Sequence, residues 1–251
     1  MSELSARKNL ILACHITGIY DVNRSNILPD DNYTLVEEWA KSIADLEMHG
    51  IIFHNNFTEA TIEKHKSKHL SFIRITHDPR FSPNVYRYIV YHDFLKTRPQ
   101  HLEGLFITDI SDVVVVKNPF IQDLYTENRS TIFCGDEPET LDNEWMKAHG
   151  EYLRLNIADY ADYEKKFAAY PLLNCGIVGG HIGIMSTFIK DLSDIHQKYN
   201  QNNPTAYTGD MGAFNYLLRT RYNDRIIHGA PVNTVFKAYE NERKDCWLRH
   251  K

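Results

Sequence analysis

Two aspartates, Asp109 and Asp112, form the pair whose spacing points most directly to chemistry. A short apolar run at 105–107 precedes them, and four consecutive valines at 113–116 follow them. Both runs favour an extended backbone, so the pair is expected at a strand edge, where open α/β sheets place their ligands. Two carboxylates that lie close together repel each other unless a cation or a donor compensates them.

The natural compensating ion for this pair is a hard divalent cation that prefers oxygen ligands, Mg²⁺ or Mn²⁺. The competing interpretation is a polar turn, because aspartate is also favoured where a side chain bonds to its own backbone in turns. The aspartate pattern alone leaves the two interpretations open.

A polar loop at 16–24 follows the first predicted strand and carries Thr17, Gly18, Asp21 and Arg24. A loop in this position of an α/β sheet often holds a nucleotide. The glycine patterns of dinucleotide-binding and P-loop proteins are both missing here, so an ordinary strand-to-helix loop is an equal alternative.

Arg87 lies in a segment, 84–95, whose apolar spacing predicts a helix. A guanidinium is a fork of donors suited to anions, so Arg87 is a candidate for a phosphate contact. A solvated arginine on the helix surface is the more common outcome.

The remaining pattern alternates strands and helices, which favours a mainly parallel α/β sheet flanked by helices. The segment 135–139 is expected to be an acidic turn that carries Asp136 and Glu137, and 142–170 a helical cover over a site. The strand expected at 172–181 is rich in glycine, which allows close approach of a ligand. Strands are expected at 10–15, 51–54, 70–75, 105–107, 130–134, 172–181 and 226–229, and helices at 34–48, 58–69, 84–95, 142–170, 186–199 (capped by Ser186 or Thr187) and 211–218.

Length and composition are those of a globular protein with a substantial core. The 251 residues are 43% hydrophobic and 24% charged, with a net charge of −5 from 28 basic and 33 acidic residues. No long basic block occurs, so nucleic acid and anionic membranes are poor candidates for a main partner. No linker or repeat divides the chain, and a single domain over 1–251 is the simpler expectation.

Four cysteines, Cys14, Cys134, Cys175 and Cys246, are widely spaced and lack the spacing of zinc or redox motifs. They are expected to be small buried residues in a reducing compartment. Neither a signal-peptide core nor an apolar run of the length that a membrane span needs is found. These features predict a cytoplasmic protein.

Several separate stretches together resemble one enzyme family, the nucleotide-sugar glycosyltransferases with the GT-A fold. The resemblance covers nearly the whole chain in the expected order, and it is greatest to small transferases of bacterial polysaccharide loci and large algal viruses. The stretches are 108–114 with 118–120 (a D-x-x-D variant of the D-x-D motif), 174–180 (an Asn-x-Gly segment), 209–215 (an acidic helix start) and 249–251 (a tail with histidine and lysine).

The resemblance implies a GT-A domain with a nucleotide-binding half at about 8–120 and a half for acceptor and donor sugar at about 121–251. It implies transfer of a sugar from a nucleotide-diphosphate sugar, by default a UDP-sugar, to a hydroxyl of a glycan or other acceptor. Charge builds on the departing diphosphate, so Mn²⁺ or Mg²⁺ and a positive side chain should face it.

The resemblance also assigns roles to particular residues. The metal would be held by Asp109 and Asp112 with either His250 or His228 as a third ligand. Asp210 would act at the reacting carbon, with Asp136 and Glu137 as second candidates. The donor would be bound by Thr17, Gly18, Asp21, Arg24, Arg87, Asp109, Asn174, Gly176 and Lys251.

Each assignment has a structural alternative. Asp210 suits a helix N-cap, a terminal histidine and lysine are usually surface residues, and Asn174 suits a strand end. At the level of function, the alternatives are a nucleotidyltransferase that makes sugar nucleotides and a non-catalytic carbohydrate-binding module on the same fold. The first alternative would need a glycine-rich triphosphate loop after the first strand, and 16–24 has a single glycine.

Overall fold

A seven-stranded mixed sheet forms the centre of the computed structural model, which describes residues 7–21, 26–97, 100–199 and 209–251. Neighbouring strands are parallel except at β9, which runs antiparallel to both of its neighbours. In spatial order the strands are β10 (Ile226–His228), β8 (Ile132–Thr140), β9 (Pro171–His181), β6 (Gly104–Thr108), β1 (Asn9–His15), β4 (Gly50–His54) and β5 (Leu70–Arg74). The expectation of a mainly parallel α/β sheet flanked by helices is confirmed.

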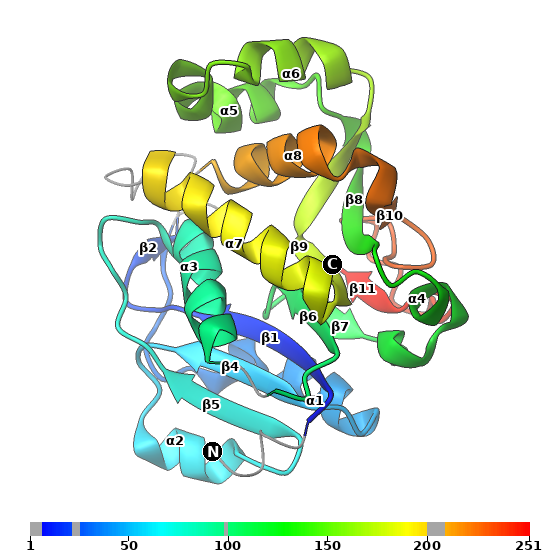
Figure 1. The fold of residues 1–251 in the computed structure, drawn as a ribbon. Helices are drawn as coiled ribbons and strands as arrows, with labels where there is room; N and C mark the ends of the chain where they lie inside the picture. Colours follow the sequence, from blue (N-terminus) through cyan, green and yellow to red (C-terminus); the bar gives the residue numbers. More distant parts are fainter. Residues whose placement is uncertain (1–6, 22–25, 98–99, 200–208) are drawn as a thin grey trace.

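Helices cover both faces of this sheet (Figure 1). One apolar cluster joins alternate side chains of the sheet to α3, α7 and α8, and a second cluster joins the opposite face to α1. This alternation is expected where both faces of a sheet are buried. The helices are α1 (Glu37–Asp45), α2 (Glu59–His65), α3 (Pro83–Lys96), α4 (Asp123–Glu127), α5 (Glu144–Asn156), α6 (Tyr160–Phe167), α7 (Ile182–Tyr199) and α8 (Asp210–Arg221).

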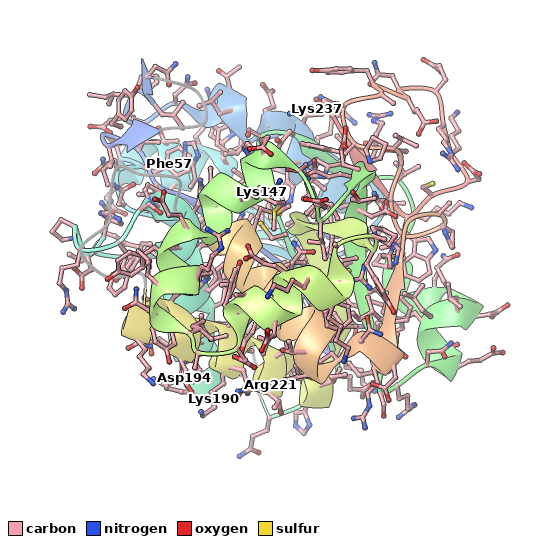
Figure 2. All side chains as sticks on the ribbon, turned by 90° about the horizontal axis from the view of Figure 1, so that it is seen from above. Phe57, Lys147, Lys190, Asp194, Arg221 and Lys237 are labelled. Atoms are coloured by element: carbon pink, nitrogen blue, oxygen red, sulfur yellow. The ribbon has the colours of Figure 1, made fainter. Side chains whose placement is uncertain are left out.

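Helices α5 and α6 lie at the top of the molecule in Figure 1 and face the viewer in Figure 2, where the label of Lys147 marks α5. They pack against α8 through buried aromatic residues such as Tyr160, whose ring stacks on Tyr216 at 5.4 Å. Asn143 caps α5 by accepting a hydrogen bond from the backbone N–H of Met146 at 2.8 Å. The segment predicted to be a helical cover is therefore helical, although it is split into two helices.

Two short strand pairs lie outside the central sheet. β2 (Tyr20–Asp21) pairs with β3 (Asn26–Ile27), and β7 (Val113–Val115) pairs antiparallel with β11 (Leu248–His250). The second pair brings the end of the chain beside the segment that follows β6 (Figure 1). The sequence indicated β7 but not its partner, because a three-residue strand has too short a pattern to detect.

Three local expectations were wrong. The expected acidic turn at 135–139 is part of β8, which pairs with β9 through two register shifts that bend the strand without ending it. Helix α7 begins at Ile182, directly after β9, so Ser186 and Thr187 lie inside it instead of capping it. The helix expected at 34–48 is shorter, because α1 spans only Glu37–Asp45.

All four cysteines carry free thiols, and Cys134, Cys175 and Cys246 are buried, as expected for small apolar side chains. Among the described residues, no helix is long and apolar enough to cross a membrane.

The close approach of β6 and β9 provides a test of the packing. Gly179 faces Phe106 across the two strands, and a Cβ at that position would overlap the phenyl ring. We expect Gly179→Ala to reduce the free energy of unfolding by about 1–3 kcal/mol, because the buried ring has no space to move into. The measurement is denaturant unfolding of the purified protein.

Gly183 is the matched control, because a Cβ there would meet nothing within 4 Å and the residue lies in α7. Gly183→Ala should leave stability unchanged or raise it by up to about 1 kcal/mol, since alanine is the better helix former. Equal stability of the two variants would contradict the packing described here.

Candidate functional site

A cavity of about 870 Å³ opens at the carboxyl ends of β1 and β6. Its walls are formed by the end of β1, by α3, by the loop after β6, and by parts of β8, α5, β9 and α8. This is the edge at which open α/β sheets bind their ligands. The candidate residues Arg87, Asp109, Asp112, Asn174 and Asp210 all line it.

Asp109, Asp112 and His250 form a group whose potential ligand atoms all lie within 4.8 Å of one another. The two aspartates are partly exposed and His250 is buried. The pairing of β11 with β7 places His250 there, opposite Val113, and the backbone N–H of Lys251 donates to the carbonyl of Asp112 at 2.9 Å. A residue at the end of the chain is thus held beside a loop in its middle.

The surroundings of this group fit a divalent cation. Neither ring nitrogen of His250 has a hydrogen bond within the described part of the chain, and Nε2 lies 3.9 Å from Oδ2 of Asp112. Burial lowers the pKa of His250 to about 4, so the imidazole is neutral near pH 7 and can donate a lone pair. A Cβ on Gly176 would lie 2.6 Å from Oδ2 of Asp109 and 2.7 Å from Cε1 of His250, so the missing side chain keeps the space open.

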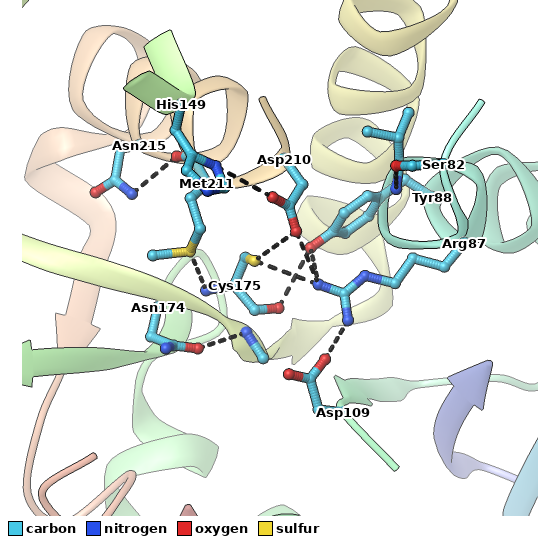
Figure 3. Close-up of polar contacts among 12 residues, drawn as sticks. Ser82, Arg87, Tyr88, Asp109, His149, Asn174, Cys175, Asp210, Met211 and Asn215 are labelled. Carbon is cyan, nitrogen blue, oxygen red and sulfur yellow. Dashed lines mark hydrogen bonds and ion pairs between the residues drawn. The ribbon is translucent and has the colours of Figure 1, made fainter. Parts of the chain in front are cut away.

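Arg87 connects Asp109 of this group to Asp210 (Figure 3). Its Nη1 donates to Oδ1 of Asp109, and its Nη2 lies 3.7 Å from Oδ2 of Asp210 and 3.2 Å from Sγ of Cys175. Arg87 is 8% exposed, and its guanidinium also packs on the ring of Tyr88. It therefore has carboxylate partners already, and a phosphate would have to compete with them.

Asp210 is the first residue of α8 and is buried. Gly209, with φ +69°, occupies the N-cap position, so Asp210 is not the N-cap. Its Oδ1 lies 3.6 Å from Nδ1 of His149, and its Oδ2 accepts a bond from Sγ of Cys175 at 3.5 Å. The side chain thus points into the cavity instead of closing the helix end (Figure 3).

Asn174 and Gly176 connect β9 to the carboxylates. The amide of Asn174 donates to Oε1 of Glu137 at 2.7 Å, and its Oδ1 accepts from the backbone N–H of Gly176 at 2.7 Å. The carbonyl of Gly176 accepts from the backbone N–H of Asp109 at 2.8 Å. Burial raises the pKa of Glu137.

Asp136 and His228 pair with each other and are not part of the Asp109–Asp112–His250 group. Nδ1 of His228 lies 2.9 Å from Oδ2 of Asp136, where β10 runs beside β8. The structure therefore groups His250, and not His228, with Asp109 and Asp112.

The expected nucleotide loop is only partly described. The hydroxyl of Thr17 donates to Asp30 at 3.0 Å and its backbone N–H donates to Asn55 at 2.9 Å, so both groups have protein partners. Gly18 has φ +74°, a conformation that favours glycine. The neighbouring His15 and Ile16 line the cavity, the backbone of Asp21 lies in β2, and Arg24 lies outside the described residues.

Lys251 follows β11, and its ammonium forms an ion pair with Glu38 on α1. Arg249 approaches the same carboxylate, at 3.5 Å. Lys251 is not among the described residues that line the cavity, and the positive charge expected for a diphosphate is paired instead with a carboxylate on α1.

Sequence reasoning did not single out Tyr88, His149 or Cys175, which surround Arg87 and Asp210. Tyr88 and Cys175 look like ordinary apolar positions of a helix and a strand. His149 lies in the 142–170 segment, whose weak periodicity gave no indication of the face it occupies. No signal in the sequence would have found them, because their role depends on contacts between distant segments.

No protein-family model matches this chain, and no curated protein matches it significantly. The site is therefore interpreted from its own geometry and chemistry.

The histidine assignment can be tested with two matched variants. We expect His250→Gln to weaken Mn²⁺ binding at least ~10-fold, because ligand orientation and identity control metal affinity. His228→Gln removes the histidine of the Asp136 pair and should leave Mn²⁺ affinity unchanged. The measurement is the electron paramagnetic resonance signal of free Mn²⁺ during titration, and the reverse ranking would reject His250 as a ligand.

His196 gives the fold around the site a pH dependence. It is fully buried in α7, it stacks on Tyr88 at 5.4 Å, and burial lowers its pKa from 6.5 to about 3. Between these two pKa values His196 binds a proton in the unfolded chain but not in the folded chain. The contribution of neutral His196 to the free energy of unfolding is therefore complete above pH 6.5 and decreases as pH falls toward 3.

His196→Phe should therefore make unfolding less sensitive to acid. Between about pH 3 and pH 6.5, the free energy of unfolding of the variant should change by about 1.4 kcal/mol less per pH unit than that of the unsubstituted protein. Denaturant unfolding at several pH values from 4.5 to 7.5 measures this, and parallel pH profiles would contradict the assignment.

Proposed function

We propose that this protein is a metal-dependent glycosyltransferase that moves a sugar from a nucleotide-diphosphate sugar, with UDP favoured, to a hydroxyl acceptor. The observation that carries the proposal is the Asp109–Asp112–His250 group, whose two aspartates line the same cavity as Arg87 and Asp210. The cavity volume of about 870 Å³ lies within the range of ligand pockets, ~300–1,000 Å³.

Asp109, Asp112 and His250 would hold Mn²⁺ or Mg²⁺. The ion would supply positive charge against the diphosphate that leaves the donor. Arg87 orients Asp109 by occupying Oδ1, while Oδ2 faces the space left by Gly176. This division of the two carboxylate oxygens is the usual arrangement of a metal ligand that is fixed by an outer partner.

Asp210 is our assignment for the residue at the reacting carbon. The guanidinium of Arg87 lies 3.7 Å away, and a nearby positive charge favours the carboxylate form. In an inverting reaction this carboxylate would accept the proton of the acceptor hydroxyl. In a retaining reaction it would stabilise positive charge on the sugar ring.

A thermal-shift titration tests the proposal. UDP at about 100 times its dissociation constant should stabilise the protein by ~2.7 kcal/mol in the presence of Mn²⁺. Without Mn²⁺ the shift should be much smaller, because the diphosphate would then face Asp109 and Asp112 without a cation between them.

Asp112→Ala distinguishes UDP binding that depends on Mn²⁺ from UDP binding that does not. Its side chain is partly exposed, so the fold should persist while the Mn²⁺-dependent part of the shift disappears. No shift with any nucleoside diphosphate, or an equal shift in this variant, would refute the proposal.

A further inference from the structure

The cavity has a second wall, on the side away from β1, that the proposed donor and metal sites leave unused. It is formed where β8 ends and α5 begins, and its lining residues are Glu137, Glu139, Asn143 and Trp145. The end of β1 and α3 lie on the other side of the cavity, where the nucleotide loop was expected.

Trp145 is the aromatic residue of this wall. It is 39% exposed and lines the cavity, so part of the indole surface is open to a ligand there. Asn143 fixes the start of α5, so the indole is carried by a capped helix and not by a loose loop. One side of its ring packs on His149, with ring centres 3.8 Å apart.

His149 connects this wall to Asp210. Its Nδ1 lies 3.6 Å from Oδ1 of Asp210, so Trp145, His149 and Asp210 follow one another along the cavity (Figure 3 shows the last two). A ligand resting on the exposed part of the indole would lie next to the carboxylate assigned to the reacting carbon.

The polar groups beside Trp145 are mainly hydrogen-bond acceptors with negative charge. Glu137 already accepts from Asn174, and Glu139 is exposed. Lys237, on the segment after β10, lines the cavity as well and is labelled in Figure 2. Carboxylates accept hydrogen bonds from hydroxyl groups and repel anions. An apolar ring face next to such acceptors matches a pyranose, which has a C–H face and a rim of hydroxyls.

We propose that Trp145, with Glu137, Glu139 and Asn143, forms a binding subsite for an uncharged pyranose, which is the acceptor sugar. The identity of this sugar as the acceptor rests on the proposed transferase function, whereas binding of the sugar does not. Two carboxylates border the subsite against the single positive charge of Lys237, so it disfavours acidic sugars.

Saturation-transfer NMR with methyl pyranosides tests the subsite. The probes are methyl glucoside, methyl galactoside and methyl mannoside, with methyl glucuronide as the acidic comparison, at millimolar concentration and without nucleotide or metal. At least one neutral probe should bind, and its affinity should fall about tenfold in Trp145→Ala and largely recover in Trp145→Phe. Methyl glucuronide should bind more weakly than methyl glucoside. Glu139→Gln should reduce this difference in affinity.

Tyr152 is the matched control. It is also on α5 and is 40% exposed, but it lies outside the set of described residues that line the cavity. Tyr152→Ala should bind the probes as the unsubstituted protein does. Absence of binding by every neutral probe, equal binding by Trp145→Ala, or glucuronide binding as strong as that of glucoside would overturn the proposal.

The two proposals fail in distinguishable ways. Probe binding that depends on Trp145, together with no Mn²⁺-dependent shift by UDP, would retain the subsite and reject the transferase. A Mn²⁺-dependent UDP shift with no probe binding would retain the transferase site and reject the subsite.

Discussion

The buried guanidinium of Arg87 is the interaction on which the rest of the site depends. It lies between Asp109, which follows β6, and Asp210, which begins α8, two residues 101 positions apart in the chain. The carboxylate of Asp210 is buried and that of Asp109 is partly exposed, and the two would repel each other without a cation between them. Removing one partner of a buried pair typically costs ~3–5 kcal/mol, so the arrangement depends on all three residues being present.

The second constraint is the pairing of β11 with β7. This short antiparallel ladder is what brings His250 to the aspartates. The tail is fixed further by the bond from Lys251 to Asp112 and by the two ion pairs with Glu38. The Asp109–Asp112–His250 group therefore combines a loop that the central sheet positions with a strand at the end of the chain, and neither segment could form the group alone.

Much of the framework was predictable because it depends on local patterns. Apolar periodicity identified the strands of the sheet and most helices, and the D-x-x-D pair was correctly placed beyond the end of β6. The resemblance named both His250 and His228, and the structure distinguishes them because β11 carries His250 toward the aspartates while Asp136 holds His228.

What was not predictable depends on tertiary contacts. The 135–139 segment has the composition of a turn, but pairing with β9 keeps it extended. Arg87 has the sequence signature of a surface residue in a helix, and only the approach of β9 and α8 makes it a buried bridge. Trp145 and His149 acquire their importance from the way α5 packs over the cavity, which no single stretch of sequence specifies.

The most direct test of the central claim is a donor-hydrolysis screen. Purified protein is incubated with a panel of nucleotide sugars in the presence of Mn²⁺, and release of nucleoside diphosphate is followed, with Asp210→Asn and Asp112→Ala in parallel. We predict release from one nucleotide sugar, most readily a UDP-sugar, that requires Mn²⁺ and is lost in both variants. Release from no donor, or release that persists without Mn²⁺ and in both variants, would contradict the account.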